Sequence, residues 1–288
     1  MIPTDSFRAD VLEYDRRASR QSWHGPRFRM TYRALGEGPT LVLLPGLAST
    51  YRGYAPLLKT LAGRFRTLII DYPGENLDDG ADLRTISHDD LVTDVLGLLD
   101  HLEVKSAALF GLSFGSTLSL KALHRAPERF AKAVLQGAFA RRRLQPPERL
   151  ALAVGRRVKG TTARLPFHEL GLSRNNRSTF PVEIPDRWSY YVEENGRTPI
   201  LGLTHRLDLL DRLDLRPILP EIGQEVRVIH GTADRIVPMK YHNELVTGLA
   251  RGQSLLMENI GHQPHWTHPD ELARLVGEFF EPAGSVRA

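Results

Sequence analysis

One serine lies in a pattern that is typical of nucleophilic catalysis. Residues 111–115 read Gly-Leu-Ser-Phe-Gly, with Ser113 at the centre. A strand-like apolar run, residues 106–110, precedes the pattern, and a helical pattern begins near Ser116. Between a strand and a helix, a G-x-S-x-G turn holds its serine in a strained backbone conformation, and glycines flank it because side chains there would collide with the turn. The helix start also favours developing negative charge. We therefore interpret Ser113 as a nucleophile.

A serine hydroxyl is a poor nucleophile at neutral pH and needs a base oriented by an acid. Asp234 follows one expected strand, and His262 lies in the loop after the next strand. Both positions are at the carboxyl ends of parallel strands, where sites in open sheets lie. We therefore predict a catalytic triad of Ser113, His262 and Asp234. The alternative for Asp234 is a structural turn residue that begins the next helix.

Other acids and histidines fit this chemistry less well. Three acids lie in a middle segment with helical leucine spacing, namely Asp208, Asp211 and Asp214. His262 and His265 have the spacing of a metal pair, but no nearby carboxylate or cysteine completes a ligand set, and Pro264 opposes a single helical face. We therefore expect no metal. His268, which precedes Pro269, is expected to start the final helix.

A second turn supplies candidate oxyanion donors. Residues 41–47, Leu-Val-Leu-Leu-Pro-Gly-Leu, end an expected central strand. The backbone amides of Leu47 and Phe114 would form an oxyanion hole, a pair of hydrogen-bond donors for the negatively charged oxygen. The alternative is an ordinary strand-ending turn punctuated by Pro45 and Gly46.

The elements that position these residues alternate between strands and helices, which predicts a parallel sheet with crossover helices. The expected buried strands are residues 40–44, 66–71, 106–112, 131–136, 225–230 and 253–257. Residues 28–35 resemble an antiparallel edge strand. The expected helices include residues 87–102, where Ser87 and Asp90 match a capping box, and residues 239–249 and 270–280.

The alternation breaks in the middle of the chain. Residues 139–216 show no clear buried strand and carry fourteen Arg and one Lys against nine Asp and Glu. We predict an inserted helical cap there, with residues 1–138 and 217–288 forming the core domain. The positive charge is either a solvated helical face or an attraction for an anionic substrate. An aromatic group either lines the substrate pocket or packs the cap, with Trp188 and Tyr191 as the substrate-binding candidates beside Tyr190 and Phe167.

Composition excludes several classes of protein. The 288 residues are 41% hydrophobic and 25% charged, as in ordinary globular proteins, and the absence of Cys excludes disulfides, thiolate metal sites and a cysteine nucleophile. A net charge of +4 without a basic stripe argues against a nucleic-acid partner. Acids near the start and the lack of 18 consecutive apolar residues predict a cytoplasmic protein without a membrane partner. The oligomeric state stays open.

Together these segments resemble the α/β-hydrolase fold family. The resemblance covers residues 28–280 and is carried by the motifs around Ser113, Asp234 and His262, by Leu44-Pro45-Gly46-Leu47 and by Asp71-Tyr72-Pro73-Gly74. It implies an eight-stranded, mostly parallel sheet with helices on both faces, a cap after the sixth strand, a Ser-His-Asp triad and no metal or organic cofactor. A serine nucleophile argues against the dehalogenase and epoxide-hydrolase branches.

Three functions follow from these residues and the resemblance. The leading hypothesis is a serine hydrolase that cleaves a small carboxylic ester, thioester or lactone through an acyl-enzyme on Ser113. The second is a carbon-carbon bond hydrolase or lyase acting on a carboxylated diketo acid or pyruvyl substrate with the same triad. The third is a non-catalytic small-molecule receptor, because one fold hosts many functions.

Overall fold

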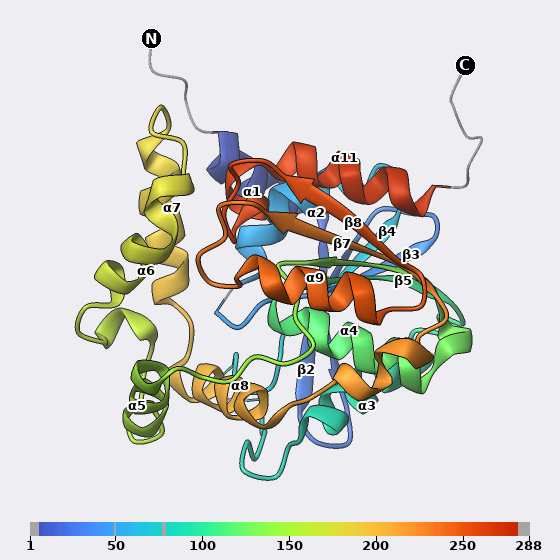
Figure 1. The fold of residues 1–288 in the computed structure, drawn as a ribbon, viewed down its shortest axis with the longest axis horizontal. Helices are drawn as coiled ribbons and strands as arrows, with labels where there is room; N and C mark the ends of the chain where they lie inside the picture. The colour runs from blue at the N-terminus through green and yellow to red at the C-terminus, as the bar shows by residue number, and fades with distance from the viewer. Residues whose placement is uncertain (1–5, 49, 77–78, 282–288) are drawn as a thin grey trace.

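The computed structural model describes residues 6–48, 50–76 and 79–281. Its centre is an eight-stranded sheet in the order β1-β2-β4-β3-β5-β6-β7-β8 (Figure 1). The pairs β1·β2 and β2·β4 are antiparallel, and every other pair is parallel. The strands are β1 (Ser19–His24), β2 (Arg29–Leu35), β3 (Thr40–Leu44), β4 (Arg66–Ile70), β5 (Ala107–Leu112), β6 (Phe130–Gln136), β7 (Glu225–Gly231) and β8 (Gly252–Met257).

Helices cover both faces of the sheet, so the central strands are buried on both sides. One face is packed by α3 (His88–His101), α4 (Phe114–Arg125) and α9 (Met239–Gly248). The other is packed by α1 (Ser6–Arg17), α2 (Ala55–Leu61) and α11 (Pro269–Phe280) (Figure 1). Burial on both faces explains the continuous apolar sequence of β3 and β5, and the predicted mostly parallel α/β sheet is confirmed.

The expected edge strand at residues 28–35 is antiparallel as predicted, but it does not lie at the edge. This strand is β2, and β1 pairs with its outer side, from Ser19 opposite Ala34 to His24 opposite Arg29. Five of the six β1 residues are exposed, so the strand has no apolar alternation from which it could be predicted. Backbone pairing with β2 specifies it instead.

Helix α3 begins where its capping residues predict. The Ser87 side chain accepts a hydrogen bond from the Asp90 amide, and the Asp90 carboxylate accepts one from the Ser87 amide. This reciprocal pair satisfies two amides that an uncapped helix start would leave without partners. At the start of α11, His268 is the N-cap residue, as expected.

Between β6 and β7 the chain forms helices and contributes no strand to the sheet over the residues that the structure describes. Its α-helices are α5 (Pro146–Gly155), α6 (His168–Asn176), α7 (Pro185–Gly196) and α8 (Ile200–Arg212), which lie beside the sheet in Figure 1. The short α10 (Pro264–Thr267) precedes α11. The 3-10 helices are η1 (Tyr51–Tyr54), η2 (Pro127–Arg129), η3 (Thr162–Arg164), η4 (Arg177–Thr179) and η5 (Arg216–Glu221). Among the described helices, none has the length and apolar character needed to span a membrane.

Candidate active site

Ser113 occupies a sharp turn between β5 and α4. Its φ of 49° and ψ of −112° are unusual for a residue with a side chain. The Ser113 amide donates a hydrogen bond to the Gln136 carbonyl at 2.9 Å, and the Ser116 hydroxyl donates one to the Ser113 carbonyl at 2.6 Å. Neighbouring strand β6 and the first turn of α4 therefore hold the strained turn in place.

The two glycines around Ser113 allow backbones to approach closely. A Cβ atom on Gly115 would lie 1.9 Å from the carbonyl oxygen of Leu44, and one on Gly111 would lie 2.3 Å from the Ser119 hydroxyl. Either contact is too short for a side chain. The glycines thus let α4 pack against the end of β3, which places the candidate nucleophile beside the turn at residues 45–48.

His262 and Asp234 lie together as the sequence predicts. The Nδ1 atom of His262 is 2.6 Å from Oδ2 of Asp234, and both side chains are buried. The other carboxylate oxygen accepts hydrogen bonds from the amides of Ile236 and Val237 at 2.8 and 2.9 Å. Burial acts to raise the pKa of Asp234, but His262 and these amides outweigh it and hold the pKa below its usual value. The carboxylate can therefore orient the imidazole.

Two residues that the sequence analysis missed connect this pair to the serine turn. The Gln136 side-chain amide donates to the His262 carbonyl at 3.4 Å, while its backbone carbonyl accepts from Ser113. Next to it, Gly137 has a φ of +56°, and a Cβ atom there would lie 2.8 Å from Cε1 of His262. A glycine directly after a buried strand is the sequence signal that could have identified this position.

The less favoured candidates lie in other surroundings. The carboxylates of Asp208, Asp211 and Asp214 form ion pairs with arginines, namely with Arg156 and Arg212, with Arg149, and with Arg141 and Arg216, respectively. His265 is buried, and its ring stacks on Tyr54 with centroids 4.3 Å apart. None of these groups is paired with His262.

The turn after β3 is tied down at consecutive residues. The Pro45 carbonyl accepts a hydrogen bond from the Tyr72 hydroxyl, and the Gly46 amide donates to the Tyr54 hydroxyl, both at 2.9 Å. A Cβ atom on Gly46 would lie 3.7 Å from the Cβ of Ser113, so the turn runs directly past the candidate nucleophile.

The aromatic group lies mostly in the core rather than on an open surface. Trp188 and Tyr191 are 8% and 2% exposed, and each packs against Phe180, with ring centroids 5.1 and 4.9 Å away. The Tyr191 hydroxyl accepts a hydrogen bond of 3.4 Å from Gln263, the neighbour of His262. Phe167, in contrast, is 79% exposed.

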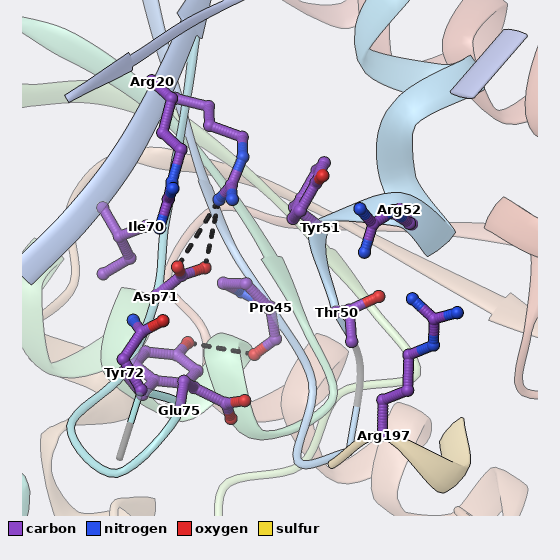
Figure 2. A pocket seen from close by; sticks show the side chains of 12 residues that line it. Arg20, Pro45, Thr50, Tyr51, Arg52, Ile70, Asp71, Tyr72, Glu75 and Arg197 are labelled. Atoms are coloured by element: carbon purple, nitrogen blue, oxygen red, sulfur yellow. Dashed lines mark hydrogen bonds and ion pairs between the residues drawn. The ribbon is translucent and has the colours of Figure 1, made fainter. Parts of the chain in front are cut away.

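A polar pocket of about 370 Å³ is lined in part by Pro45. Four arginines line it, Arg20, Arg33, Arg52 and Arg197, together with the carboxylates of Asp71 and Glu75. Figure 2 shows Arg52 and Arg197 on one side of the pocket and the two carboxylates on the other. Ser113 does not line this pocket.

A family model described as alpha/beta hydrolase fold matches residues 39–269. The chain belongs to the α/β-hydrolase fold family. The matched region contains the serine turn and the His262–Asp234 pair, so the resemblance stated from the sequence is confirmed.

Named relatives of this α/β hydrolase are hydrolases. The chain is 28% identical, over 86% of its own length and 90% of the relative, to 2-hydroxy-6-oxononadienedioate/2-hydroxy-6-oxononatrienedioate hydrolase 1 of Pseudomonas putida. It is also 28% identical to the pimeloyl-[acyl-carrier protein] methyl ester esterase of Xanthomonas campestris, over 85% of this chain and 96% of the relative. The protein is therefore an enzyme of the hydrolase class.

Solved structures support the same fold. The enol-lactonase from Burkholderia xenovorans superimposes with a TM-score of 0.80, at 24% identity, over 90% of this chain and 99% of that one. A thermophilic esterase from Thermogutta terrifontis gives a TM-score of 0.79 at 19% identity, over 91% and 98% of the two chains. At these identities the likeness establishes the architecture only.

Proposed function

We propose that this hydrolase cleaves a small carboxylic ester, thioester or lactone through an acyl-enzyme on Ser113. The observation that carries the proposal is the 2.6 Å contact between His262 Nδ1 and Asp234 Oδ2, in a site joined through Gln136 to the turn that bears Ser113. An imidazole held at Nδ1 by a carboxylate keeps Nε2 free to accept a proton from a serine hydroxyl.

Each step of the proposed reaction uses one of these groups. The Ser113 hydroxyl oxygen bonds to the substrate carbonyl carbon while its proton passes to His262. The amides of Leu47 and Phe114 donate hydrogen bonds to the resulting oxyanion. His262 then returns the proton to the leaving oxygen or sulfur, and the acyl-enzyme forms. Water repeats the sequence with His262 as base, which releases the acid and restores Ser113.

We also propose that residues 139–216 act as a cap over this site. The proposal is supported by the position of α7 and α8, which contact the turn that carries Leu47. The expected roles of Trp188 and Tyr191 differ in this arrangement: Trp188 packs the cap, whereas Tyr191 reaches Gln263 beside His262 and is the better candidate for the pocket wall.

A second candidate is hydrolysis of a carbon-carbon bond in a carboxylated diketone by the same triad. One observation favours it. A relative from Pseudomonas putida is named 2-hydroxy-6-oxononadienedioate/2-hydroxy-6-oxononatrienedioate hydrolase 1, and the compounds in that name carry carboxylates.

The discriminating experiment compares wild type with Ser113→Ala and Asp234→Asn on two substrate panels. The first contains p-nitrophenyl acetate, butyrate and octanoate, and the second contains 2-hydroxy-6-oxo dienoates. Ester turnover that disappears in Ser113→Ala and falls about 10³- to 10⁴-fold in Asp234→Asn supports the esterase proposal. Turnover of the dienoates alone supports the second candidate. Equal rates for wild type and Ser113→Ala on both panels would overturn both.

A further inference from the structure

Two helices of the segment 139–216 hold the turn that carries the Leu47 amide. The Nε atom of Arg206, in α8, donates a hydrogen bond to the Leu47 carbonyl at 2.9 Å. The side-chain amide of Asn195, in α7, donates one to the Ala48 carbonyl, also at 2.9 Å. The two carbonyls belong to consecutive residues. Helices about 150 residues further along the chain therefore bind the backbone of this turn.

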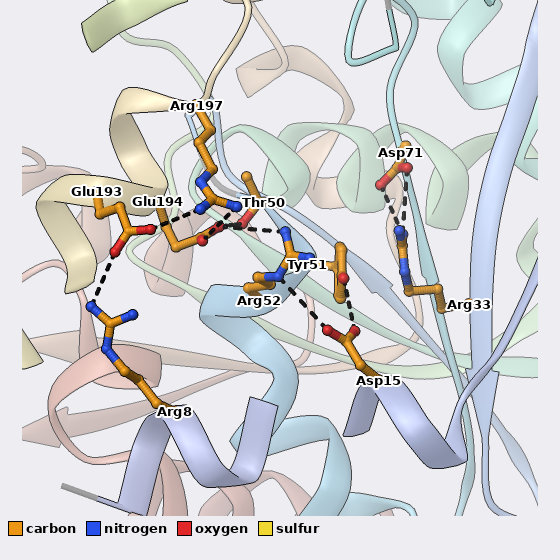
Figure 3. A network of polar contacts seen from close by, with 10 residues as sticks. All are labelled: Arg8, Asp15, Arg33, Thr50, Tyr51, Arg52, Asp71, Glu193, Glu194 and Arg197. Carbon is orange, nitrogen blue, oxygen red and sulfur yellow. Dashed lines mark hydrogen bonds and ion pairs between the residues drawn. The ribbon is translucent and has the colours of Figure 1, made fainter. Parts of the chain in front are cut away.

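A third contact lies two residues further along the turn. The Thr50 hydroxyl donates to Oε2 of Glu194 at 2.9 Å. Glu194 is 2% exposed and lies between Arg197, at 3.3 Å, and Arg52, at 3.9 Å. Figure 3 shows the Glu194 carboxylate beside Thr50 with both guanidinium groups directed at it. The acceptor of the Thr50 bond is therefore itself held by two cations.

Arg206 is fully buried, which is costly for a charged side chain unless it is paired. It forms an ion pair with Glu75. One helical turn earlier, a Cβ atom on Gly202 would lie 2.7 Å from the Gly74 carbonyl, so α8 packs backbone against backbone on the loop after β4. This close packing fixes the position of α8, and with it the position of the Arg206 side chain relative to the Leu47 carbonyl.

The side chain of Asn195 is also oriented by a second contact, on the oxygen of its amide. Its Oδ1 atom is 3.0 Å from Nε2 of His168, which leaves the NH₂ group directed toward Ala48. An amide that is held at both ends positions its partner more sharply than one that rotates freely.

We infer that Arg206, Asn195 and the Thr50–Glu194 pair are positioning residues for the oxyanion hole. They fix the backbone that directly follows the Leu47 amide, so the hole is complete only while α7 and α8 contact the turn. The inference rests on the proposed function, because it takes Leu47 as an oxyanion donor. Displacement of a donor by a fraction of an ångström weakens transition-state stabilisation more than substrate binding.

The test uses variants that remove one donor with little change in size. Asn195→Asp removes the donor to Ala48, and Thr50→Val removes the donor to Glu194, whereas Thr50→Ser retains it. Arg212→Ala is the control for α8, because Arg212 lies in the same helix and its side chain is 74% exposed. Each purified variant is assayed for kcat and KM on a p-nitrophenyl ester, and for inhibition by an aryl boronic acid that forms a tetrahedral adduct with serine.

We expect kcat to fall about 10- to 100-fold in Asn195→Asp and in Thr50→Val, with KM changed by less than about threefold. The boronic acid should lose affinity in parallel with kcat. Thr50→Ser and Arg212→Ala should behave like wild type. A rise in KM at constant kcat, or loss of kcat with unchanged boronic acid affinity, would overturn the inference.

Hydrogen exchange separates this inference from the proposed function. The amides of residues 46–48 should exchange faster in Asn195→Asp and Thr50→Val than in wild type, at a temperature at which all three proteins are fully folded. If wild type lacks any Ser113-dependent activity, the proposed function is overturned, and the catalytic role of these contacts is overturned with it because it depends on that function. If that activity is present but neither exchange nor kcat changes in the variants, only the inference is overturned.

Discussion

The imidazole of His262 occupies the space that a side chain at Gly137 would fill. A Cβ atom at Gly137 would lie 2.8 Å from Cε1 and 2.9 Å from Nδ1 of the ring. The same backbone has a φ of +56°, which L-residues rarely adopt. The glycine that directly follows strand β6 therefore makes room for the candidate base, and His262 keeps its contact with Asp234.

Gly137→Ala should therefore displace His262 and lower kcat by at least about 100-fold, because the hydrogen bond to Asp234 is lost with the ring position. Gly80→Ala is the matched control. Gly80 also has a positive φ, of +79°, but an added Cβ there meets nothing within 4 Å. Both variants should lose about 1 kcal/mol of stability from backbone strain, and only Gly137→Ala should lose activity. Equal kcat values for the two variants would contradict this account of Gly137.

The strands and the candidate triad differ in how far the sequence predicts them. The apolar runs of β3 and β6 predicted strands because strands covered on both faces must be continuously apolar. Strand β1 could not be predicted, since its side chains are exposed and only its backbone pairing defines it. Ser113, Asp234 and His262 could be proposed as a triad from the sequence because nucleophilic catalysis requires particular residue types at strand ends.

The role of Arg206 could not be predicted from the sequence, for a different reason. It is one of fourteen arginines in residues 139–216, and nothing in its local sequence marks it as buried. Its contact with Leu47 depends on how α8 packs against the loop after β4, which is a tertiary property. Long-range packing of the helical segment is therefore the part of the site that the sequence does not specify locally.

The strain at Ser113 predicts a gain in stability when the side chain is removed. Ser113→Gly should unfold with a free energy about 1 kcal/mol higher than wild type, because glycine adopts a φ of 49° without a steric penalty. Ser113→Ala retains a Cβ atom and should show no such gain. Both variants should be inactive. Chemical denaturation checks the difference, and a Ser113→Gly variant less stable than Ser113→Ala would contradict stored strain at this turn.

His265 predicts that stability decreases in acid. Burial, together with a smaller effect of neighbouring His262, lowers the pKa of His265 to about 3. The unfolded chain takes up this proton near pH 6.5 and the folded chain does not, so the stabilisation is complete above pH 6.5 and is lost as the pH falls toward 3. The loss should be about 2 kcal/mol between pH 7 and pH 5.

His265→Phe should reduce that acid dependence, because phenylalanine retains the stacking on Tyr54 and carries no titrating group. Unfolding free energies measured at pH 7 and pH 5 for wild type and variant give the comparison. An unchanged difference between the two pH values would show that His265 does not contribute to it.

We expect Trp188 to contribute to the stability of the fold rather than to substrate binding. Its ring packs against Phe180 and Tyr191 and is 8% exposed. Trp188→Ala should therefore lower the free energy of unfolding by about 3 kcal/mol. Phe167→Ala is the control, because Phe167 is 79% exposed and should have little effect. If Trp188→Ala raised KM at unchanged stability, Trp188 would belong to the pocket instead.

Trapping the acyl-enzyme tests the proposed role of Ser113 as nucleophile. Wild type mixed with excess p-nitrophenyl acetate and quenched in acid within the first turnovers is digested and analysed by mass spectrometry. We expect an acetyl group on the peptide that contains Ser113, a matching burst of p-nitrophenol, and neither signal in Ser113→Ala. Steady turnover of the ester with no adduct on Ser113, or with an adduct that persists in Ser113→Ala, would show that Ser113 is not the nucleophile.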